Sequence, residues 1–367
     1  MVSLLNRFKS NSIFWMAPIV ILLGLQSCED KDDKYVRVAQ PVVDLTQVPY
    51  PNLSEYHFFE GDMKLQKPVY GVIPYQPASS LFTDYALKKR FIWLPKNTKA
   101  TYNSDATILE LPVGAALIKT FYYDHVQPSN TTQIIETRVL IKKETGWVVA
   151  EYVWNDEQTE ATLQLLGSTK TISWLDATNT VKTADYQIPS ETNCYMCHNV
   201  NNITRPIGIK PQNLNNNYSY SEGSRNQLDK LISFGYLENN LPSTIVSTVN
   251  YEDTTQPLNL RMRSYFDINC AHCHQDGAYG AFYVMRFAFN QTTNPANLGI
   301  CMTASHVAPG NPATIIVKPH DINRSLLFYR VSTNDMNYRM PFLGRTIRDE
   351  EGIQLITDWI NSLTGCN

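Results

Sequence analysis

Residues 135–154 read IETRVLIKKETGWVVAEYVW, and this stretch decides the fold class of the first half of the chain. Its second part is typical of a half-buried strand, with one face formed at period two by Val148, Ala150, Tyr152 and Trp154. The part from Ile135 to Lys142 predicts a preceding strand, and the polar residues 143–146 with their glycine have the length of a hairpin loop. We therefore expect an antiparallel hairpin here.

The sequence on both sides of this stretch predicts a β-rich domain over residues 53–200. Proline and glycine punctuate it frequently, and helical periodicity is scarce. Further strands are expected at 116–123, 161–166 and 171–175. The character changes after residue 200, where an asparagine-rich connecting segment covers 201–257 and contains a helical candidate at 224–234.

Helical signals return in residues 258–367. A helix is expected from Leu258 into a cysteine motif, followed by a long irregular stretch at 275–321. Another helix is expected at 324–331, and a last one begins near Asp349. Carboxylates in the first turn of the last helix complement its dipole. Its apolar stripe consists of Ile353, Ile356, Trp359, Ile360 and Leu363. The sequence thus predicts an α+β multidomain protein, with a β-rich N-terminal domain followed by an all-α domain.

Composition limits the function classes. The chain has 367 residues, 43% of them hydrophobic, which is enough for roughly two folded domains. With 31 Lys and Arg against 34 Asp and Glu, the net charge of −3 provides no field that would attract polyanions. We therefore expect no nucleic-acid partner.

The N-terminus predicts export. Arg7 and Lys9 precede an apolar run from Ile13 to Leu25, which is too short for a permanent membrane helix. The small residue before Cys28 and the leucine three positions before it resemble a bacterial lipobox, which implies cleavage after residue 27 and a lipid on Cys28. An ordinary signal peptide is the alternative. Residues 28–52 then form a tether whose charged start resembles an outer-membrane sorting signal, so we expect an outer-membrane lipoprotein facing the periplasm or the cell surface.

Two cysteine pairs carry the chemistry. Both follow the pattern C-x-x-C-H, formed by Cys194, Cys197 and His198 and again by Cys270, Cys273 and His274. Two thiols one helical turn apart can bond the vinyl groups on one porphyrin edge, while the adjoining histidine binds the iron. The pattern therefore predicts two covalently bound haem c groups. Zinc ribbons pair their cysteines within about 15 to 20 residues, whereas 73 positions separate Cys197 from Cys270.

Around the second motif the sequence resembles a class I cytochrome c module, from Leu258 to Leu363. The resemblance rests on the helix before Cys270, the motif itself, Met340-Pro341 and the final amphipathic helix. It implies that His274 and Met340 are the two axial iron ligands; Met302 and Met336 are rivals for Met340, but neither precedes proline. Together with segments 318–327 and 340–345, both motifs also resemble a family of dihaem c-type cytochrome lipoproteins.

The first motif is less complete. Residues 55–200 are similar to β-sheet haem proteins of the cytochrome c′-β type in the order of their parts, with a β-rich region followed by the motif. This resemblance implies that His198 is the proximal iron ligand and that the distal side of the haem is open or weakly filled. No Met-Pro occurs between the two motifs. His57, His125 and Met262 are other ligand sources, each of which is better explained as an ordinary surface or core residue.

The remaining cysteines are Cys301 and Cys366. An oxidising compartment favours a disulfide between them, and two unpaired thiols are the alternative.

These observations predict a membrane-tethered dihaem electron carrier that exchanges electrons with redox partner proteins, among them a quinoprotein dehydrogenase. Two other hypotheses stay open at this point. One is a dihaem peroxidase-like or small-ligand-binding haem enzyme that uses a five-coordinate first haem. The other is a structural or sensory lipoprotein whose β-rich domain binds a partner.

Overall fold

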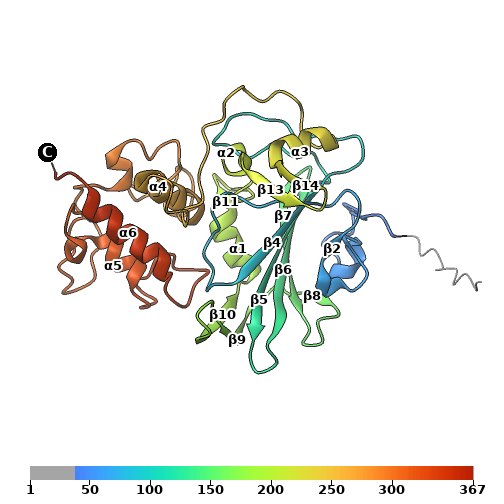
Figure 1. The fold of residues 1–367 in the computed structure, drawn as a ribbon, viewed down its shortest axis with the longest axis horizontal. Helices are drawn as coiled ribbons and strands as arrows, with labels where there is room; N and C mark the ends of the chain where they lie inside the picture. Colours follow the sequence, from blue (N-terminus) through green and yellow to red (C-terminus); the bar gives the residue numbers. More distant parts are fainter. Residues whose placement is uncertain (1–37, 367) are drawn as a thin grey trace, which may run out of the picture. The chain divides into compact units, whose positions relative to one another are not determined.

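The computed structural model describes residues 38–366, and its central feature is an antiparallel sheet whose long strands lie side by side (Figure 1). The strand order is β10-β9-β5-β6-β7-β8, while β4 pairs with β5 and β3 pairs with β4. The sheet consists of β3 (Ile73–Pro74), β4 (Leu87–Trp93), β5 (Ala116–Val126), β6 (Thr131–Lys143), β7 (Gly146–Trp154), β8 (Ala161–Leu163), β9 (Ser168–Leu175) and β10 (Val181–Ile188). The predicted hairpin is formed by β6 and β7, and the expected β-rich region is confirmed.

The other elements are short. Three two-stranded pairs are formed by β1 (Phe59–Glu60) with β2 (Lys67–Pro68), β11 (Asn199–Val200) with β12 (Ile203–Thr204), and β13 (Asn217–Tyr220) with β14 (Gly223–Asn226). The α-helices are α1 (Glu191–His198), α2 (Pro211–Leu214), α3 (Gln227–Phe234), α4 (Leu258–Asn269), α5 (Leu326–Ser332) and α6 (Glu350–Ser362). The 3₁₀ turns are η1 (Leu53–Tyr56), η2 (Met63–Leu65), η3 (Pro295–Leu298) and η4 (Ile322–Arg324).

Apolar clusters cover both faces of the sheet at strands β4 to β7. Each of these strands contributes to both clusters, because successive strand residues point to opposite sides. One face packs against the N-terminal segment through a cluster that includes Phe91, Ile118, Val139 and Ala150. The next residues along the same strands belong to a cluster on the other face, formed in part by Ile92, Leu117, Leu140 and Val149. This second cluster also contains Cys194 of α1, so the first cysteine motif is held on the sheet.

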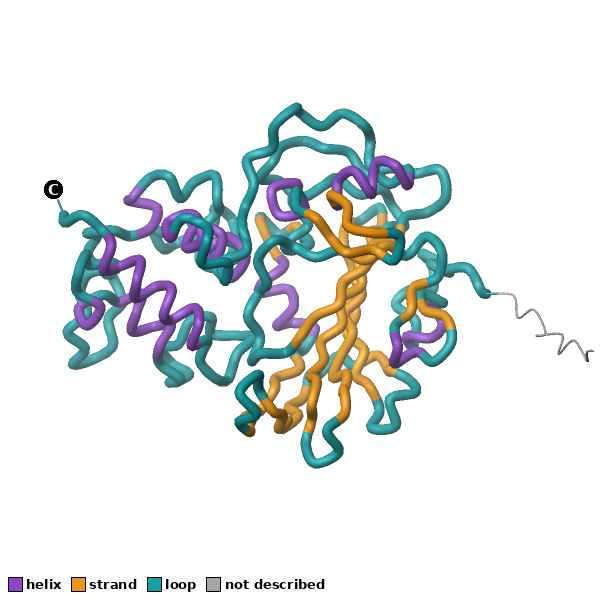
Figure 2. Tube along the Cα trace, in the orientation of Figure 1, coloured by secondary structure: helices purple, strands orange, loops and turns teal. Residues whose placement is uncertain are grey.

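The expectation of an all-α C-terminal domain is wrong. The described part of the chain contains more strand than helix, and residues 258–366 contain the α-helices α4, α5 and α6 and the short turns η3 and η4 among long irregular segments (Figure 2). Residues 275–321 contain no α-helix, and isolated bridges pair Ile300 with Val317 and Thr303 with Ile315. The physical reason lies in the sequence: Pro295, Gly299, Pro309, Gly310 and Pro312 interrupt any helix that would start in this segment.

The three helices still form a common core. Phe266 of α4 packs edge-on against Trp359 of α6 at 5.7 Å between ring centroids, and it stacks on Phe287 at 4.5 Å. Asp349 caps α6 by accepting a hydrogen bond from the backbone nitrogen of Gly352. The buried side of α6 is formed by Leu355, Ile356, Trp359 and Ile360. From Val38 onward, the chain forms one compact unit.

Candidate functional site

The second motif begins where α4 ends. Cys270 is the C-terminal cap of this helix, and the backbone nitrogens of Cys273 and His274 both donate to the Cys270 carbonyl, at 3.2 and 3.0 Å. This tight turn keeps both thiols and the imidazole at one end of α4. Gly280 lies against the turn, and a Cβ atom there would be 3.0 Å from the Cys273 carbonyl oxygen. A larger residue at Gly280 would therefore push the following loop away from the motif.

A cavity of about 730 Å³ opens beside this turn. Cys270, Cys273 and His274 line one part of it, and Met340 and Pro341 line another. Its remaining walls are largely apolar and include Phe266, Phe287, Leu327 and Val331. This size and lining are typical of a cavity that buries a large, flat organic cofactor and fixes it with a few polar groups.

The imidazole of His274 is buried and neutral. Its Nδ1 atom is buried and has no hydrogen-bond partner in the described structure. Burial, followed by the charges of His272 and Arg286, lowers the pKa of His274 to about 4, so the ring is neutral at physiological pH. The ring packs edge-on against Phe287 at 5.1 Å between centroids. A neutral imidazole is the form that binds a metal ion.

Met340 is held by its backbone. The Met340 nitrogen donates to the Arg330 carbonyl at 2.8 Å, and the Met340 carbonyl accepts from Arg345 Nε at 3.1 Å. The two rival methionines are placed differently: Met336 is 71% exposed, and Met302 does not line the cavity. Met340 is thus the sequence-predicted methionine that faces the same cavity as His274.

The first motif lies within α1, which Ser190 caps by accepting a hydrogen bond from the Asn193 backbone. Cys194 is buried, and its thiol donates to Glu151 Oε2 on β7 at 3.7 Å. His198 Nδ1 lies 2.8 Å from the Arg205 carbonyl oxygen. Such a bond to a backbone carbonyl orients the ring and leaves the other nitrogen to bind a metal. Burial lowers the pKa of His198 to about 4, so this ring is also neutral.

The two motifs differ in how well their surroundings fit a haem. At the second motif, both thiols, the neutral histidine and Met340 share one large apolar cavity, and these residues fit the group. At the first motif, the cavity lined by Cys197 and His198 is only about 150 Å³, and Cys194 does not line it. That volume is below the few hundred Å³ usual for cofactor sites. The thiols and the neutral histidine of the first motif fit a haem, whereas that cavity alone would not hold one.

The two motifs also meet. Ligand atoms of Cys197, His272 and Cys273 all lie within 4.8 Å of one another, and Cys197 lines the large cavity as well. A hydrogen bond from Cys273 lowers the pKa of Cys197, whereas burial opposes this shift. His272 Nδ1 is buried without a partner. Two thiols and an imidazole are also zinc ligands, so this cluster offers an alternative use of two cysteines that the sequence assigns to haem.

Other residues singled out from the sequence are placed elsewhere. His57 and His125 are exposed, and Met262 belongs to α4 and is fully buried in the core. None of these three lines either cavity. Cys28 and the export signal lie outside the described residues. Among residues 38–366, no helix is long and apolar enough to cross a membrane.

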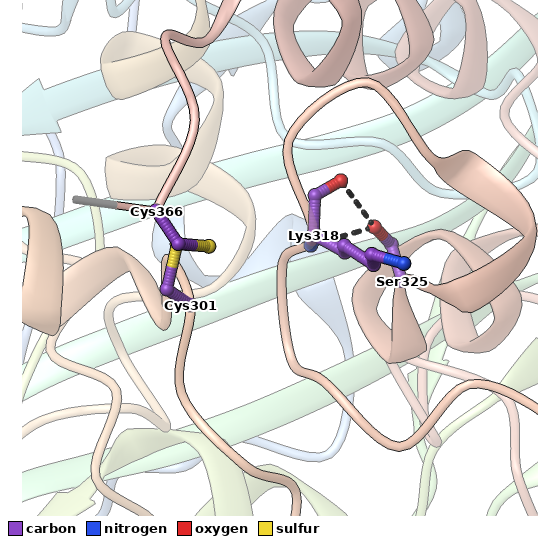
Figure 3. The surroundings of a disulfide bond; sticks show 4 residues. All are labelled: Cys301, Lys318, Ser325 and Cys366. Carbon is purple, nitrogen blue, oxygen red and sulfur yellow. Dashed lines mark hydrogen bonds between the residues drawn. A yellow bond between two sulfur atoms is a disulfide. The ribbon is translucent and has the colours of Figure 1, made fainter.

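Cys301 and Cys366 form a disulfide, with their Cα atoms 5.6 Å apart (Figure 3). The Cys301 backbone nitrogen donates to Val317, and the next residue, Lys318, exchanges two hydrogen bonds with Ser325 Oγ. The disulfide therefore ties the chain end after α6 to the loop network that leads into α5.

Arg345 is a site residue whose role sequence reasoning missed. It is 2% exposed, and its guanidinium donates to backbone carbonyls on both sides of the Met340 loop. The sequence shows only that Arg345 lies five residues after Met340, and this spacing does not reveal its contacts.

Comparisons of the chain with protein-family models, with curated proteins and with solved structures found no match.

Proposed function

We propose that this protein is a c-type cytochrome that carries electrons through a haem bound covalently at Cys270 and Cys273. One observation carries the proposal: His274 and Met340, 66 positions apart in the sequence, line the same large apolar cavity together with both thiols. A haem bound there would supply one-electron redox chemistry. The predicted attachment at Cys194 and Cys197, with His198 as ligand, is the second part of the proposal and rests on the motif and on the His198–Arg205 bond.

The residues of this chain would bind, orient and shield the group. His274, neutral and packed against Phe287, offers a nitrogen that needs no deprotonation. Met340 offers a thioether, and a His/Met pair gives a higher reduction potential than more strongly donating ligands. The aromatic and aliphatic walls exclude water, which lowers the cost of reorganising solvent when the charge changes.

Haem counting tests the proposal. The full chain should be produced with haem-attachment machinery, and its pyridine haemochrome spectrum should give two haems per chain. The double variant Cys270→Ala/Cys273→Ala should lose one haem, and Cys194→Ala/Cys197→Ala should lose the other. A wild-type protein without covalent haem, or with zinc bound at Cys197, His272 and Cys273 instead, would overturn the proposal.

Location and partners form a separate part of the proposal. We propose that Cys28 carries a lipid that tethers the protein to the outer membrane, where redox proteins such as a quinoprotein dehydrogenase deliver electrons. Labelling with a radioactive fatty acid should mark the wild type and not Cys28→Ala. Stopped-flow mixing with a reduced quinoprotein should show reduction of the haem, and a rate no faster than that of free quinol would argue against such a donor.

A further inference from the structure

One row of the central sheet carries three cations side by side. Arg90 on β4 lies opposite Lys119 on β5, and Lys119 lies opposite Arg138 on β6. Directly opposed residues of antiparallel strands point to the same face, and like charges in such positions are destabilising. The row therefore needs a compensating group that faces it.

The row lies between two apolar clusters. Along β5, Leu117, Lys119 and Phe121 alternate onto one face; Leu117 belongs to the cluster that contains Cys194, and Phe121 belongs to a different one. Around the Phe121 ring, the Lys119 ammonium lies 4.6 Å from the centroid, the Arg138 guanidinium carbon 4.5 Å, and the Lys88 ammonium 5.9 Å. Four cations are thus gathered where the two apolar clusters leave a gap.

The protein itself supplies little negative charge to this gap. Glu136 is already bound by Arg138 and by the hydroxyl of Tyr186. Burial, and then the neighbouring Glu136, raises the pKa of Glu151 to about 10, so Glu151 is uncharged at physiological pH. The ion pair that Arg138, its neighbour in the row, makes is with Glu136.

Two of the cations lack a partner. Within the described residues, neither the Arg90 guanidinium nor the Lys119 ammonium makes a hydrogen bond or an ion pair, and Arg90 is only 6% exposed. Burial, with Arg90 and Arg138 next in importance, lowers the pKa of Lys119 well below its usual value. The Lys88 and Lys119 side chains remain partly exposed, so a solute can reach them. A buried guanidinium without a partner is costly, and an anion in contact with the row would offset that cost and favour the protonated form of Lys119.

We propose that Arg90, Lys119 and Arg138 form a binding site for a carboxylate or small oxyanion on the sheet face beside the first motif. The site is close to the first motif, because Glu151 lies opposite Arg138 in the row and its Oε2 atom is 3.7 Å from Cys194 Sγ. The anion has two sources with the same chemistry: the propionates of a haem attached at Cys194 and Cys197, or a free anion from solution. The first source rests on the proposed function, whereas the second does not.

Calorimetric titration of the full chain with inorganic phosphate separates the sources. If the anion is free, the wild type binds phosphate and Lys119→Gln weakens binding by about tenfold or more, as expected for the loss of one charged contact. If propionates fill the site, the wild type does not bind phosphate, but Cys194→Ser/Cys197→Ser does, and Lys119→Gln in that background weakens it. If neither protein binds phosphate, or if Lys119→Gln leaves binding unchanged, the proposal is wrong.

Two further variants keep the test clear. Lys96→Gln removes an exposed lysine outside the row and should change nothing. Lys119→Arg keeps the charge and should restore phosphate binding, which a merely structural role of the lysine stem would not explain. Haem counts on the same samples test the proposed function separately, because phosphate binding by a haem-free chain would support the anion site while contradicting the cytochrome.

Discussion

At the scale of single residues, Arg345 explains why Met340 can face the cavity. Its guanidinium donates to the carbonyls of Met340 at 3.1 Å, Val331 at 3.2 Å and Thr333 at 2.8 Å. Burying a guanidinium is costly unless its donors are satisfied, and here backbone carbonyls satisfy them. The arginine thereby binds the end of α5 to the loop that carries Met340 and Pro341.

The first prediction concerns Met340. If Met340 binds the iron of the proposed haem, Met340→Ala should abolish the charge-transfer absorption band between ferric iron and methionine sulfur. It should also lower the reduction potential of that haem, because the thioether ligand is lost. Met336→Ala is the matched control, since Met336 is 71% exposed and should leave the band unchanged. Optical spectra and redox titrations of both variants make the comparison. Persistence of the band in Met340→Ala would contradict the ligand assignment.

The second prediction concerns Glu151, whose raised pKa of about 10 is caused first by burial and then by Glu136. In the unfolded chain this carboxyl ionises near its ordinary pKa, so between about pH 5 and pH 9 the folded state holds one more proton. The free energy of unfolding should therefore fall as pH rises, by at most about 1.4 kcal/mol per pH unit from this group. Glu151→Gln stays neutral and should make that fall shallower.

Urea unfolding at several pH values checks this expectation. The other groups that face Glu151 are Glu136, Arg138 and Cys194, and they remain in the variant. Glu157→Gln, an exposed change nearby in the chain, should keep the wild-type slope. Identical slopes for wild type and Glu151→Gln would mean that Glu151 is ionised in the folded protein.

At the scale of secondary-structure elements, the disulfide between Cys301 and Cys366 secures the chain end after α6. It closes a loop with a sequence separation of 65. Cross-linking a loop of that length restricts the unfolded chain and stabilises the folded state by about 4 kcal/mol in the chain-entropy model. Cys366→Ser should therefore lower the free energy of unfolding by about that amount.

The measurement is urea unfolding of wild type and Cys366→Ser, each with and without a reducing agent. Reduction should destabilise the wild type to the level of the variant and should leave the variant where it was. Equal unfolding midpoints for oxidised wild type and Cys366→Ser would contradict the prediction and would mean that α6 is held by its packing on α4 alone.

The elements also show what the sequence could predict. The strands β5, β6, β7 and β9 could be predicted from short runs of strand-forming residues between turn signals, and the helix α6 from its apolar stripe. The all-α expectation failed because three short helices set the predicted class of residues 258–367, although the expected irregular stretch at 275–321 is longer than any of them. The proximity of Cys197 to Cys273 depends on how segments distant in the sequence pack together, so a local sequence pattern cannot predict it. The cationic row likewise depends on strand register.

At the scale of the whole described chain, Asp84 connects the sheet-bearing half to the segment after Met340. Its carboxylate is 1% exposed and accepts hydrogen bonds from the backbone nitrogens of Thr346 and Ile347, at 2.6 and 3.0 Å, and from the Thr346 hydroxyl at 3.0 Å. Similar links join Phe82 to Asn269 and Lys210 to Asp267 across the same boundary. The loop that presents Met340 is therefore anchored from both halves of the molecule.

This anchoring leads to the last prediction. Asp84→Ala leaves buried donors on Thr346 and Ile347 without an acceptor and should lower the free energy of unfolding by about 3 kcal/mol. Asp84→Asn retains an acceptor oxygen and should lose much less, while the exposed Asp62→Ala should stay within about 0.5 kcal/mol of wild type. In Asp84→Ala the iron–methionine band should also weaken, because Thr346 lies six residues after Met340 and the loop loses its outer support. Urea unfolding and ferric absorption spectra of the three variants provide both readouts. A band of full strength in a destabilised Asp84→Ala would show that Arg345 alone positions Met340, and that the two halves of the chain are coupled in stability without being coupled at the ligand.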